Sequence, residues 1–317
     1  MIQWGILGVG KIAGRFMKSL ANHSDGQLYA VASLTASKRR EFHTNFPDIC
    51  VYESYIQLLE DPNVDAVYIA MRHKDHYQWA KEALKRKKAV LCEKPATLSY
   101  QQTKELCDLA KANQTFFMEA MKTRFIPLIA DIKELLEQGE IGDILRVETC
   151  FAYAVDYREG HYLHDKDQGG ILNDVGSYNL ASILDYIHSP IKKITSQVVF
   201  ENEVDVHDQI ELIFESGQTA LIDIACNENK EKLMTIIGTH GKMTANPFYR
   251  PTSARISLQN GQEYTIHKPY IYDDFYTEID EVHQCLQHQQ IESSRMSFQD
   301  SLDIIEATER IRKSFYQ

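Results

Sequence analysis

The sequence predicts an α/β protein of two domains. The first is built on a doubly wound parallel sheet, and the second, of α+β type, on an open, mostly antiparallel sheet. Up to residue 118, short apolar runs alternate with helical segments, a pattern typical of a parallel sheet covered by helices. The alternation breaks near Glu119, and strand-like runs dominate beyond it. A chain of 317 residues is long enough for two domains, which we expect over residues 1–121 and 122–317.

The composition narrows the possible partners. A formal net charge of −11 argues against nucleic acid, because phosphate binding needs a clustered basic face. The sequence shows neither an apolar run long enough to cross a bilayer nor a cationic, apolar leader, so we expect a cytoplasmic protein without a membrane partner. The six cysteines are scattered without a Cys-x-x-Cys pair, which predicts reduced core thiols and no metal site.

The first strand-to-helix junction has the pattern of a dinucleotide-binding turn. The apolar run 2–7 leads into Gly8-Val9-Gly10-Lys11-Ile12-Ala13, which opens a helix. The first glycine permits a turn that a side chain would strain, the second lets a pyrophosphate approach the backbone, and the small third residue lets helix and strand pack closely. The helix amides, from Lys11 and Ile12 onward, then face the phosphates. Small residues also serve ordinary turns, so that alternative stays open.

The end of the second expected strand, 27–34, predicts the form of the cofactor. NAD-binding folds place an acidic residue about 20 residues after the glycines, where it binds the ribose 2′-hydroxyl. Here the chain reads Ser33-Leu34-Thr35-Ala36-Ser37-Lys38-Arg39-Arg40, without an acid. Hydroxyl groups and cations suit a 2′-phosphate, so NADP is favoured, NAD is possible, and Ser33, Thr35 and Lys38 are the expected contacts. Alternatively, Lys38 to Arg40 only begin a solvated helix.

The strand expected over 64–70 is followed by Met71-Arg72-His73-Lys74-Asp75-His76. Residues beyond the carboxyl ends of parallel strands line the ligand crevice, so Ala70, Arg72, His73 and His76 are candidates for cofactor contact. For each histidine the alternative is a helix cap or a surface polar group.

Glu93-Lys94-Pro95 follows the next expected strand. The proline biases the lysine before it toward extended geometry, which directs the lysine side chain at the crevice. There Lys94 would bind the nicotinamide ribose and a substrate oxygen. The alternative is an exposed lysine paired with Glu93.

The second domain is expected to begin with an amphipathic helix over 126–138. Strand-like runs follow over 143–153, 194–200, 209–215, 218–225, 234–238 and 254–258. One helix interrupts these strands after Gly169-Gly170, and two helices, 275–288 and 297–315, close the chain.

The interrupting segment, Gly169 to Tyr178, carries the candidate chemistry of the second domain. On an α-helix, Asp174 and Tyr178 are four residues apart and share one face. A tyrosine hydroxyl can relay a proton to a substrate oxygen, and a nearby ammonium such as that of Lys94 would favour its ionised form. Gly176 inside this helix indicates a close approach by another backbone or a ligand. The alternative is a core tyrosine and a helix-start acid.

Together these motifs resemble the glucose-fructose oxidoreductase, inositol dehydrogenase and rhizopine catabolism (Gfo/Idh/MocA) oxidoreductase family. The similarity rests on the glycine turn, on Glu93-Lys94-Pro95, on Met118-Glu119-Ala120-Met121-Lys122-Thr123-Arg124-Phe125, on the Gly-Gly-x4-Asp-x-Gly-x-Tyr segment and on the terminal helices. Cys92 before Glu93 and the Met-Glu-Ala-x-x-Thr-Arg-Phe segment are most similar to the branch of the dimeric dihydrodiol dehydrogenases and the NADP-dependent D-xylose dehydrogenase.

The resemblance implies a Rossmann domain and a C-terminal domain whose open sheet covers the substrate and forms a homodimer or higher homo-oligomer. It implies Lys94, Asp174 and Tyr178 at the nicotinamide. Lys122 stands where the dihydrodiol branch has a tryptophan, which argues against aromatic diols. The expected substrate contacts are Arg124, Tyr157, Arg158, His161 and Tyr162.

We therefore expect an NAD(P)-dependent dehydrogenase that transfers a hydride between nicotinamide and a sugar, polyol or diol, with Tyr178 and Lys94 handling the proton. Two alternatives are a non-catalytic regulatory protein that senses a dinucleotide and an imine or enone reductase on the same scaffold.

Overall fold

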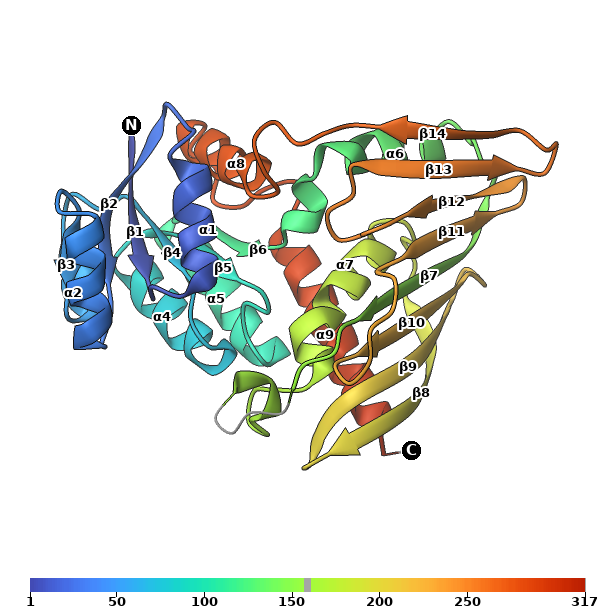
Figure 1. Cartoon of the computed structure of the whole chain (residues 1–317), viewed down its shortest axis with the longest axis horizontal. Coiled ribbons are helices and arrows are strands. Elements are labelled where there is room, and N and C mark those ends of the chain that lie inside the picture. Colours follow the sequence, from blue (N-terminus) through green and yellow to red (C-terminus); the bar gives the residue numbers. More distant parts are fainter. Residues whose placement is uncertain (157–160, 317) are drawn as a thin grey trace. The chain divides into compact units, whose positions relative to one another are not determined.

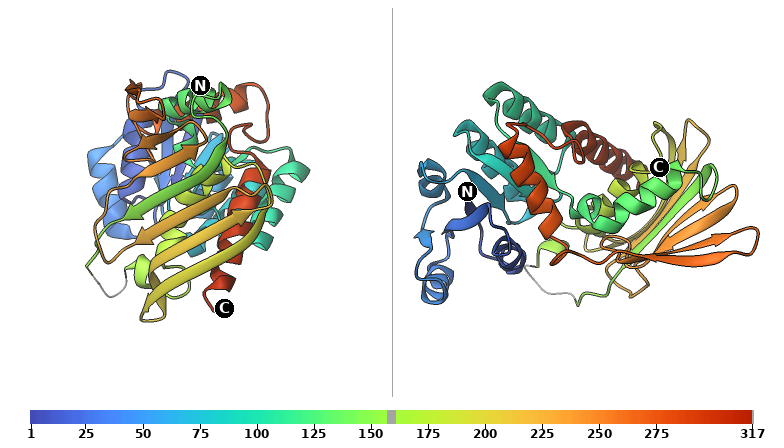
Figure 2. Two further views of the ribbon diagram at one scale, coloured as in Figure 1. Left: turned by 90° about the vertical axis from the view of Figure 1, so that its right-hand side faces the viewer. Right: turned by 90° about the horizontal axis from the view of Figure 1, so that it is seen from above.

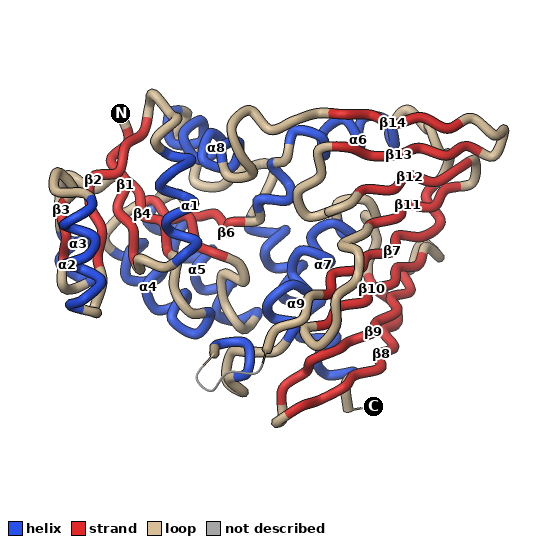
Figure 3. The backbone as a smooth tube through the Cα atoms, viewed as in Figure 1, coloured by secondary structure: helices blue, strands red, loops and turns tan. Residues whose placement is uncertain are grey.

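The computed structural model describes residues 1–156 and 161–316, and its chain divides into two compact units. The first unit comprises Met1–Met121 and Ile271–Leu302, and the second comprises Lys122–Tyr270 and Asp303–Gln317. Figure 1 labels the helices and strands, and Figure 3 colours helices, strands and loops separately. The chain thus leaves the first unit after residue 121 and returns to it for residues 271–302, whereas the sequence predicted one continuous second domain.

The first unit is built on a six-stranded parallel sheet with the order β3-β2-β1-β4-β5-β6. The strand order reverses between β1 and β4, which is where ligands bind in doubly wound sheets. At this point the Ala70 N–H donates to Leu7 O at 3.0 Å, so the loops after the two strands are adjacent. The strands are β1 (Ile2–Leu7), β2 (Gly26–Ala32), β3 (Cys50–Tyr52), β4 (Ala66–Ile69), β5 (Ala89–Glu93) and β6 (Phe117–Ala120).

Helices cover the sheet of the first unit, with α4 packed against α5 and α1 against α8 (Figure 1). All four residues of β4 are buried, as expected for a strand covered on both faces. The Trp4 indole N–H donates to Nε2 of His283, a residue 279 positions later, and so fastens α8 to this unit. The helices are α1 (Lys11–Leu20), α2 (Ala36–Asn45), α3 (Tyr55–Glu60), α4 (His73–Lys85), α5 (Tyr100–Asn113) and α8 (Tyr276–Gln287).

The second unit is built on an eight-stranded sheet with the order β14-β13-β12-β11-β7-β10-β9-β8. Only β7 and β10 pair in parallel, and the other neighbouring strands are antiparallel. Burial alternates along much of β9, as expected when one face of a sheet is covered. The strands are β7 (Ile144–Ala152), β8 (Ile191–Glu201), β9 (Val204–Phe214), β10 (Thr219–Ala225), β11 (Met234–Gly238), β12 (Gly241–Ala245), β13 (Ser253–Leu258) and β14 (Glu263–His267).

The described helices of the second unit lie on one face of its sheet (Figure 2). Two short 3₁₀ turns and one π-helical turn stand among them. These elements are η1 (Lys122–Phe125), α6 (Pro127–Glu137), η2 (Tyr162–His164), the π-helical η3 (Leu172–Gly176), α7 (Ser177–Leu184) and α9 (Phe298–Ser314). Helix α9 begins in the first unit, and its residues from 303 onward belong to the second.

The structure confirms the predicted fold class, a parallel sheet with helices followed by a mostly antiparallel sheet. The sequence missed β3, β12 and β14, which have only three, five and five residues. It was also wrong about Cys50, which is exposed rather than part of the core. Among the described residues, no helix combines the length and the apolar character needed to cross a membrane.

Candidate functional site

The glycine turn closes against the end of β4. Gly8 has a φ of +95°, a conformation that favours glycine, and a Cβ there would lie 2.5 Å from Ala70 O. Gly10 is the N-cap of α1 with a φ of −89°, and a Cβ there would meet no atom of the described chain within 4 Å. Gly8 is therefore required by the fold itself, whereas the space beside Gly10 is available to a ligand.

The start of α1 fits an anionic ligand. Its first N–H groups, at Lys11 and Ile12, have no acceptor one turn earlier in the helix. No acidic side chain stands in this first turn, and Gly10 offers no side-chain cap. A pyrophosphate could therefore accept these hydrogen bonds at the positive end of the helix dipole.

The residues after β2 include a cation, Lys38, near the expected ribose site. Ser33 is buried and its Oγ accepts from the Thr35 N–H at 3.3 Å, while Lys38 is exposed on α2. Lys38 and Gly10 line the same pocket of about 530 Å³, whose other walls include Met17 and Phe42. Of the expected residues, Lys38 and Gly10 thus share this mostly apolar pocket, whereas Ser33 and Thr35 do not line it.

Arg39 was not among the predicted contacts, although it stands in the basic run after β2. Its Nη1 donates to Ser33 O at 2.8 Å, and its Nη2 lies 3.7 Å from the Glu53 carboxylate. The guanidinium is therefore held beside Ser33. The sequence did offer a signal for this placement. Thr35 can be read as a helix N-cap, and residue 39 lies about one helical turn after it, so its side chain returns toward the end of β2.

The histidines after β4 lie at the start of α4. His76 is buried, with Nδ1 2.8 Å from Pro95 O and Nε2 3.2 Å from Met71 O. Burial lowers the pKa of His76, which favours a neutral ring that donates from one nitrogen at a time. His76 thus connects the loop after β4 to the loop after β5. His73 is also buried, Arg72 is the exposed N-cap of α4, and their contact with a cofactor stays a prediction.

Each oxygen of the Glu93 carboxylate accepts a hydrogen bond from a residue of the first unit. The Tyr68 hydroxyl donates to Oε1 at 2.5 Å, and the Lys94 N–H donates to Oε2 at 3.2 Å. Tyr68 in turn stacks on Phe16 of α1, with 4.0 Å between ring centroids. Glu93 therefore fixes the backbone that carries Lys94, whose own side chain is half-buried.

In the second unit, Asp174 lies in the π-helical turn η3, and its carboxylate accepts hydrogen bonds from two tyrosine hydroxyls. The Tyr153 hydroxyl donates to Oδ2, and the Tyr162 hydroxyl donates to Oδ1 at 3.1 Å. Burial and the Asp174 charge raise the pKa of both tyrosines, which therefore stay protonated donors. Tyr153 was missed by the sequence analysis, because the end of β7 and η3 are brought together only by the fold.

Tyr178 stands in the first turn of α7 and is buried against aromatic side chains. Its ring centroid lies 6.1 Å from that of Phe151 and 5.7 Å from that of Tyr249. A Cβ on Gly176 would lie 2.8 Å from Leu172 Cδ1, so this glycine makes room for a leucine side chain rather than for a backbone. The π-helical turn also changes the expected α-helical spacing between Asp174 and Tyr178.

The remaining substrate candidates have varied surroundings. Arg124 is buried in η1, with Nη2 3.2 Å from Asp185 Oδ1, an ion pair that gives it a structural role. His161 caps η2 by accepting from the Leu163 N–H at 3.4 Å. Tyr157 and Arg158 lie outside the described residues.

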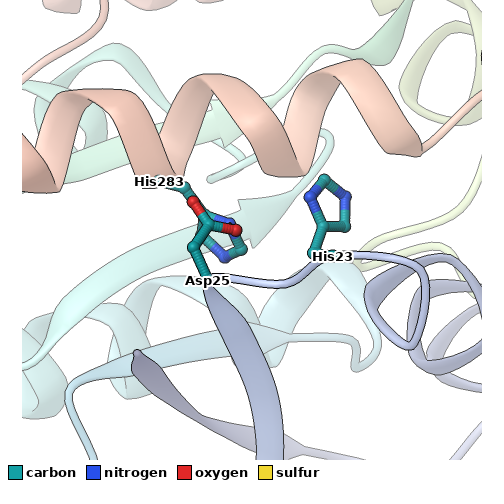
Figure 4. A group of neighbouring side chains, drawn as sticks. All are labelled: His23, Asp25 and His283. Atoms are coloured by element: carbon teal, nitrogen blue, oxygen red, sulfur yellow. The ribbon is translucent and has the colours of Figure 1, made fainter.

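Two histidines and an aspartate gather where α8 meets the loop before β2 (Figure 4). His23, Asp25 and His283 each offer a possible ligand atom within 4.8 Å of the others. Because the Trp4 N–H donates to Nε2 of His283, the proton of this neutral ring is on Nδ1, which donates to Asp25 Oδ1 at 2.8 Å. A metal ion would have to break one of these two hydrogen bonds, so we assign the cluster to the attachment of α8.

Comparison with known proteins relates the whole chain to one family of enzymes. The model of the oxidoreductase family with an NAD-binding Rossmann fold matches residues 2–121, and that of the GFO/IDH/MocA C-terminal domain matches residues 129–244. The chain is 30% identical to the D-xylose 1-dehydrogenase (NADP(+)) of Hypocrea jecorina, over 97% of this chain and 90% of that protein.

Two further relatives cover nearly the same length. The chain is 28% identical to the trans-1,2-dihydrobenzene-1,2-diol dehydrogenase of Mus musculus, over 99% of this chain and 96% of that protein. A solved structure of a 3-ketoreductase from Actinomadura kijaniata, in complex with TDP-benzene and NADP, has a TM-score of 0.87 at 23% identity, over 99% of this chain and 97% of that one. This last similarity is one of fold.

Proposed function

The chain belongs to the Gfo/Idh/MocA oxidoreductase family, and from that premise we propose that it is an NADP-dependent dehydrogenase acting on a CH–OH group of a sugar, polyol or diol. The observation that carries this proposal is the glycine turn, which is shaped for a dinucleotide in a chain related along 97% of its length to an NADP-dependent sugar dehydrogenase. The relatives named as D-xylose and dihydrodiol dehydrogenases support the branch that the sequence resembles.

The residues of the first unit suit NADP better than NAD. Lys38 and Arg39 follow β2, the hydroxyls of Ser33 and Thr35 stand beside them, and residues 33–40 contain no carboxylate. A 2′-phosphate would receive charge-assisted hydrogen bonds there, whereas the acid that binds the 2′-hydroxyl of NAD is missing. Gly8, Gly10, Lys11 and Ile12 would hold the pyrophosphate, and Ala70, Arg72, His73, His76 and Glu93 would form or support the crevice beyond it.

Tyr178 is the proposed acid and base of the reaction, and Lys94 assists it. The bound nicotinamide supplies or accepts the hydride, while Tyr178 exchanges the proton of the substrate oxygen. Lys94 would stabilise the ionised phenol by its charge. Asp174, which already holds Tyr153 and Tyr162, would orient the substrate beside Tyr178.

We also propose that the protein is a cytoplasmic homodimer or higher homo-oligomer formed through the face of the second unit's sheet that its described helices leave uncovered. Ile213, Leu221 and Ile237 alternate with buried neighbours and so stand on that face. Such apolar side chains on an open sheet are suited to contact with a second copy. Light scattering coupled to size-exclusion chromatography measures the mass in solution, and a purely monomeric mass would refute this part.

A turnover panel tests the function. Purified protein is incubated with aldoses, polyols and diols, each with NADP⁺ and NAD⁺, and reduced cofactor is followed by absorbance. We expect turnover of at least one hydroxyl substrate, with the higher kcat/KM for NADP⁺. Tight binding of NADPH without any turnover would instead favour a dinucleotide sensor. A second panel of imines and enones with NADPH tests the remaining alternative, and turnover in that panel alone would favour a reductase of those groups.

A further inference from the structure

The segment that carries Asp174 and Tyr178 is held from behind by a carboxylate of β9. Asp205 Oδ2 accepts from the Leu172 N–H at 2.8 Å, at the first residue of η3. Gly170, two residues earlier, has a φ of +91°, and a Cβ there would lie 2.1 Å from Asp205 Oδ1. The second glycine of the Gly-Gly pair is thus needed because the Asp205 carboxylate lies against the backbone.

A side chain of α9 holds the same segment from another direction. Arg312 Nη2 donates to Asn173 Oδ1 at 2.5 Å, and Asn173 Nδ2 donates to Gly169 O at 2.8 Å. The start of η3 is therefore fixed at two neighbouring residues: Asp205 holds the backbone N–H of Leu172, and Arg312 holds the side chain of Asn173. Burial raises the pKa of Asp205, while the Leu172 N–H and the Arg312 charge oppose this rise.

A second carboxyl group, Asp208, lies three residues further along β9, where a register shift in the pairing with β8 between His207 and Asp205 interrupts the regular alternation, and its side chain is within hydrogen-bond reach of Asp205. Asp208 is 0% exposed, and neither of its oxygens has a hydrogen-bond donor among the described residues. Two adjacent carboxylates would repel each other in this setting, and burial would add a further cost to each charge. Burial, and then the Asp205 charge, raise the pKa of Asp208 to about 9. A neutral Asp208 becomes a donor, and the Asp205 carboxylate is the acceptor beside it.

We propose that Asp205 and Asp208 share one proton and act together as positioning residues for the reaction proposed above, holding the turn η3, which carries Asp174 and leads directly into α7 with Tyr178. In this arrangement Asp208 donates its proton to Asp205. Asp205 remains ionised and binds the Leu172 N–H. The pair does not touch substrate or cofactor and works only through the backbone of η3.

The other titratable groups near the pair leave this assignment unchanged between pH 5 and 9. Arg312, from α9, is a cation whose charge acts on both carboxyl groups. The thiol of Cys226, after β10, stays neutral because burial and the carboxylates around it raise its pKa to about 11. Asp208 in the folded protein therefore keeps a proton that the unfolded chain loses near its ordinary value of 3.8. As the pH rises from about 5 to 9, this difference removes stability from the folded state.

Two pairs of variants test the proposal. Asp208→Asn keeps the shape and supplies an N–H donor to Asp205, whereas Asp208→Ala removes the donor. Asp205→Ala removes the acceptor of the Leu172 N–H, and Asp205→Asn keeps an oxygen there. Unfolding in urea at pH 5, 7 and 9 measures the stability that depends on the shared proton. Hydrogen exchange of the peptide containing Leu172 measures how firmly η3 is held. The value of kcat shows whether a displaced η3 slows the reaction.

We expect the wild-type protein to lose stability relative to Asp208→Asn as the pH rises from 5 to 9. Asp205→Ala should speed exchange at Leu172 and lower kcat roughly 10- to 100-fold with the Kd for NADPH unchanged, because displacement of the turn misplaces the reacting groups. Asp205→Asn should keep both the slow exchange at Leu172 and kcat close to their wild-type values. The same pH dependence in wild type and Asp208→Asn would overturn the shared proton, and unchanged exchange in Asp205→Ala would overturn the positioning role.

These outcomes are separate from the fate of the proposed reaction. The unfolding and exchange measurements need no substrate, so a protein that turns over nothing in the panel still tests the carboxyl pair. Should Asp205→Ala fail to fold, Asp208→Asn and Asp205→Asn still report the proton and the turn.

Discussion

Replacing Gly10 by alanine should separate cofactor binding from folding. A Cβ at this position meets no described atom within 4 Å, and a φ of −89° is allowed for alanine. Alanine is a poorer N-cap than glycine by up to about 1 kcal/mol, while the loss of backbone freedom in the unfolded chain offsets about 0.4–1 kcal/mol. The free energy of unfolding should therefore change by less than about 0.5 kcal/mol.

The same methyl group would stand where a pyrophosphate approaches the start of α1. Loss of one charge-assisted hydrogen bond between a phosphate and a backbone N–H costs about 1.5–3 kcal/mol, or a roughly 10- to 150-fold higher Kd. Fluorescence titration with NADPH measures that Kd, and urea unfolding measures the stability.

Gly14→Ala is the matched control. A Cβ at Gly14 also meets no described atom within 4 Å, and although Gly14 lines the same pocket as Gly10, it lies one turn into α1 and its N–H already donates to Gly10 O at 3.2 Å. It should stabilise the protein by about 0.5–1 kcal/mol and leave the Kd unchanged. A wild-type Kd in Gly10→Ala would refute the assignment of the pyrophosphate to this turn.

Three further predictions concern other parts of the two units. Arg39→Ala should raise the Kd for NADPH about 10-fold or more while the Kd for NADH stays unchanged, because only the former carries a 2′-phosphate; an equal change for both cofactors would remove Arg39 from the ribose site. Arg124→Met leaves the Asp185 carboxylate, which is 8% exposed, with Lys133 as its remaining cation, whose Nζ lies 3.1 Å from Asp185 Oδ2, and should lower the free energy of unfolding by about 1.5–3 kcal/mol. Lys166→Ala, which breaks an exposed pair with Glu203, should cost less than about 1 kcal/mol. Similar urea midpoints for the two variants would contradict this. Burial and then His283 lower the pKa of His23 to about 4, so the unfolded chain binds a proton first as the pH falls. Wild-type stability should therefore decline between about pH 6.5 and 4 more steeply than that of His23→Gln, and parallel melting-temperature profiles would show that His23 does not carry this loss.

Local patterns predicted the parts of the site that lie within one strand-to-helix junction. The glycine turn could be predicted because both the left-handed Gly8 and the open space at Gly10 follow from glycine itself. The placement of Lys38 and of Glu93-Lys94-Pro95 at or beyond the ends of β2 and β5 could be predicted because parallel strands end at one edge of their sheet, and their contact with a cofactor stays a prediction. The helix–strand alternation likewise predicted the first sheet, apart from the three-residue strand β3.

The rest depends on contacts between distant parts of the chain. Tyr153 reaches Asp174 from 21 residues away, Asp205 reaches Leu172 from 33, and Trp4 reaches His283 from 279. Contacts between residues so far apart leave no periodic pattern in the local sequence. The hydrogen bond from Leu172 to Asp205 and the packing of α8 in the first unit were therefore not predicted. The π-helical turn was missed for a related reason, because Gly176 and Leu172 fit together only in the folded segment.

The most direct test of the central claim is a single-turnover measurement of Tyr178→Phe. The variant and the wild-type protein are loaded with NADP⁺ and mixed with the best hydroxyl substrate of the panel, and NADPH formation is followed in a stopped-flow instrument. If Tyr178 exchanges the substrate proton, the rate of hydride transfer should fall by about 10²- to 10⁴-fold while the Kd for NADPH stays unchanged. A wild-type rate in Tyr178→Phe would contradict the account.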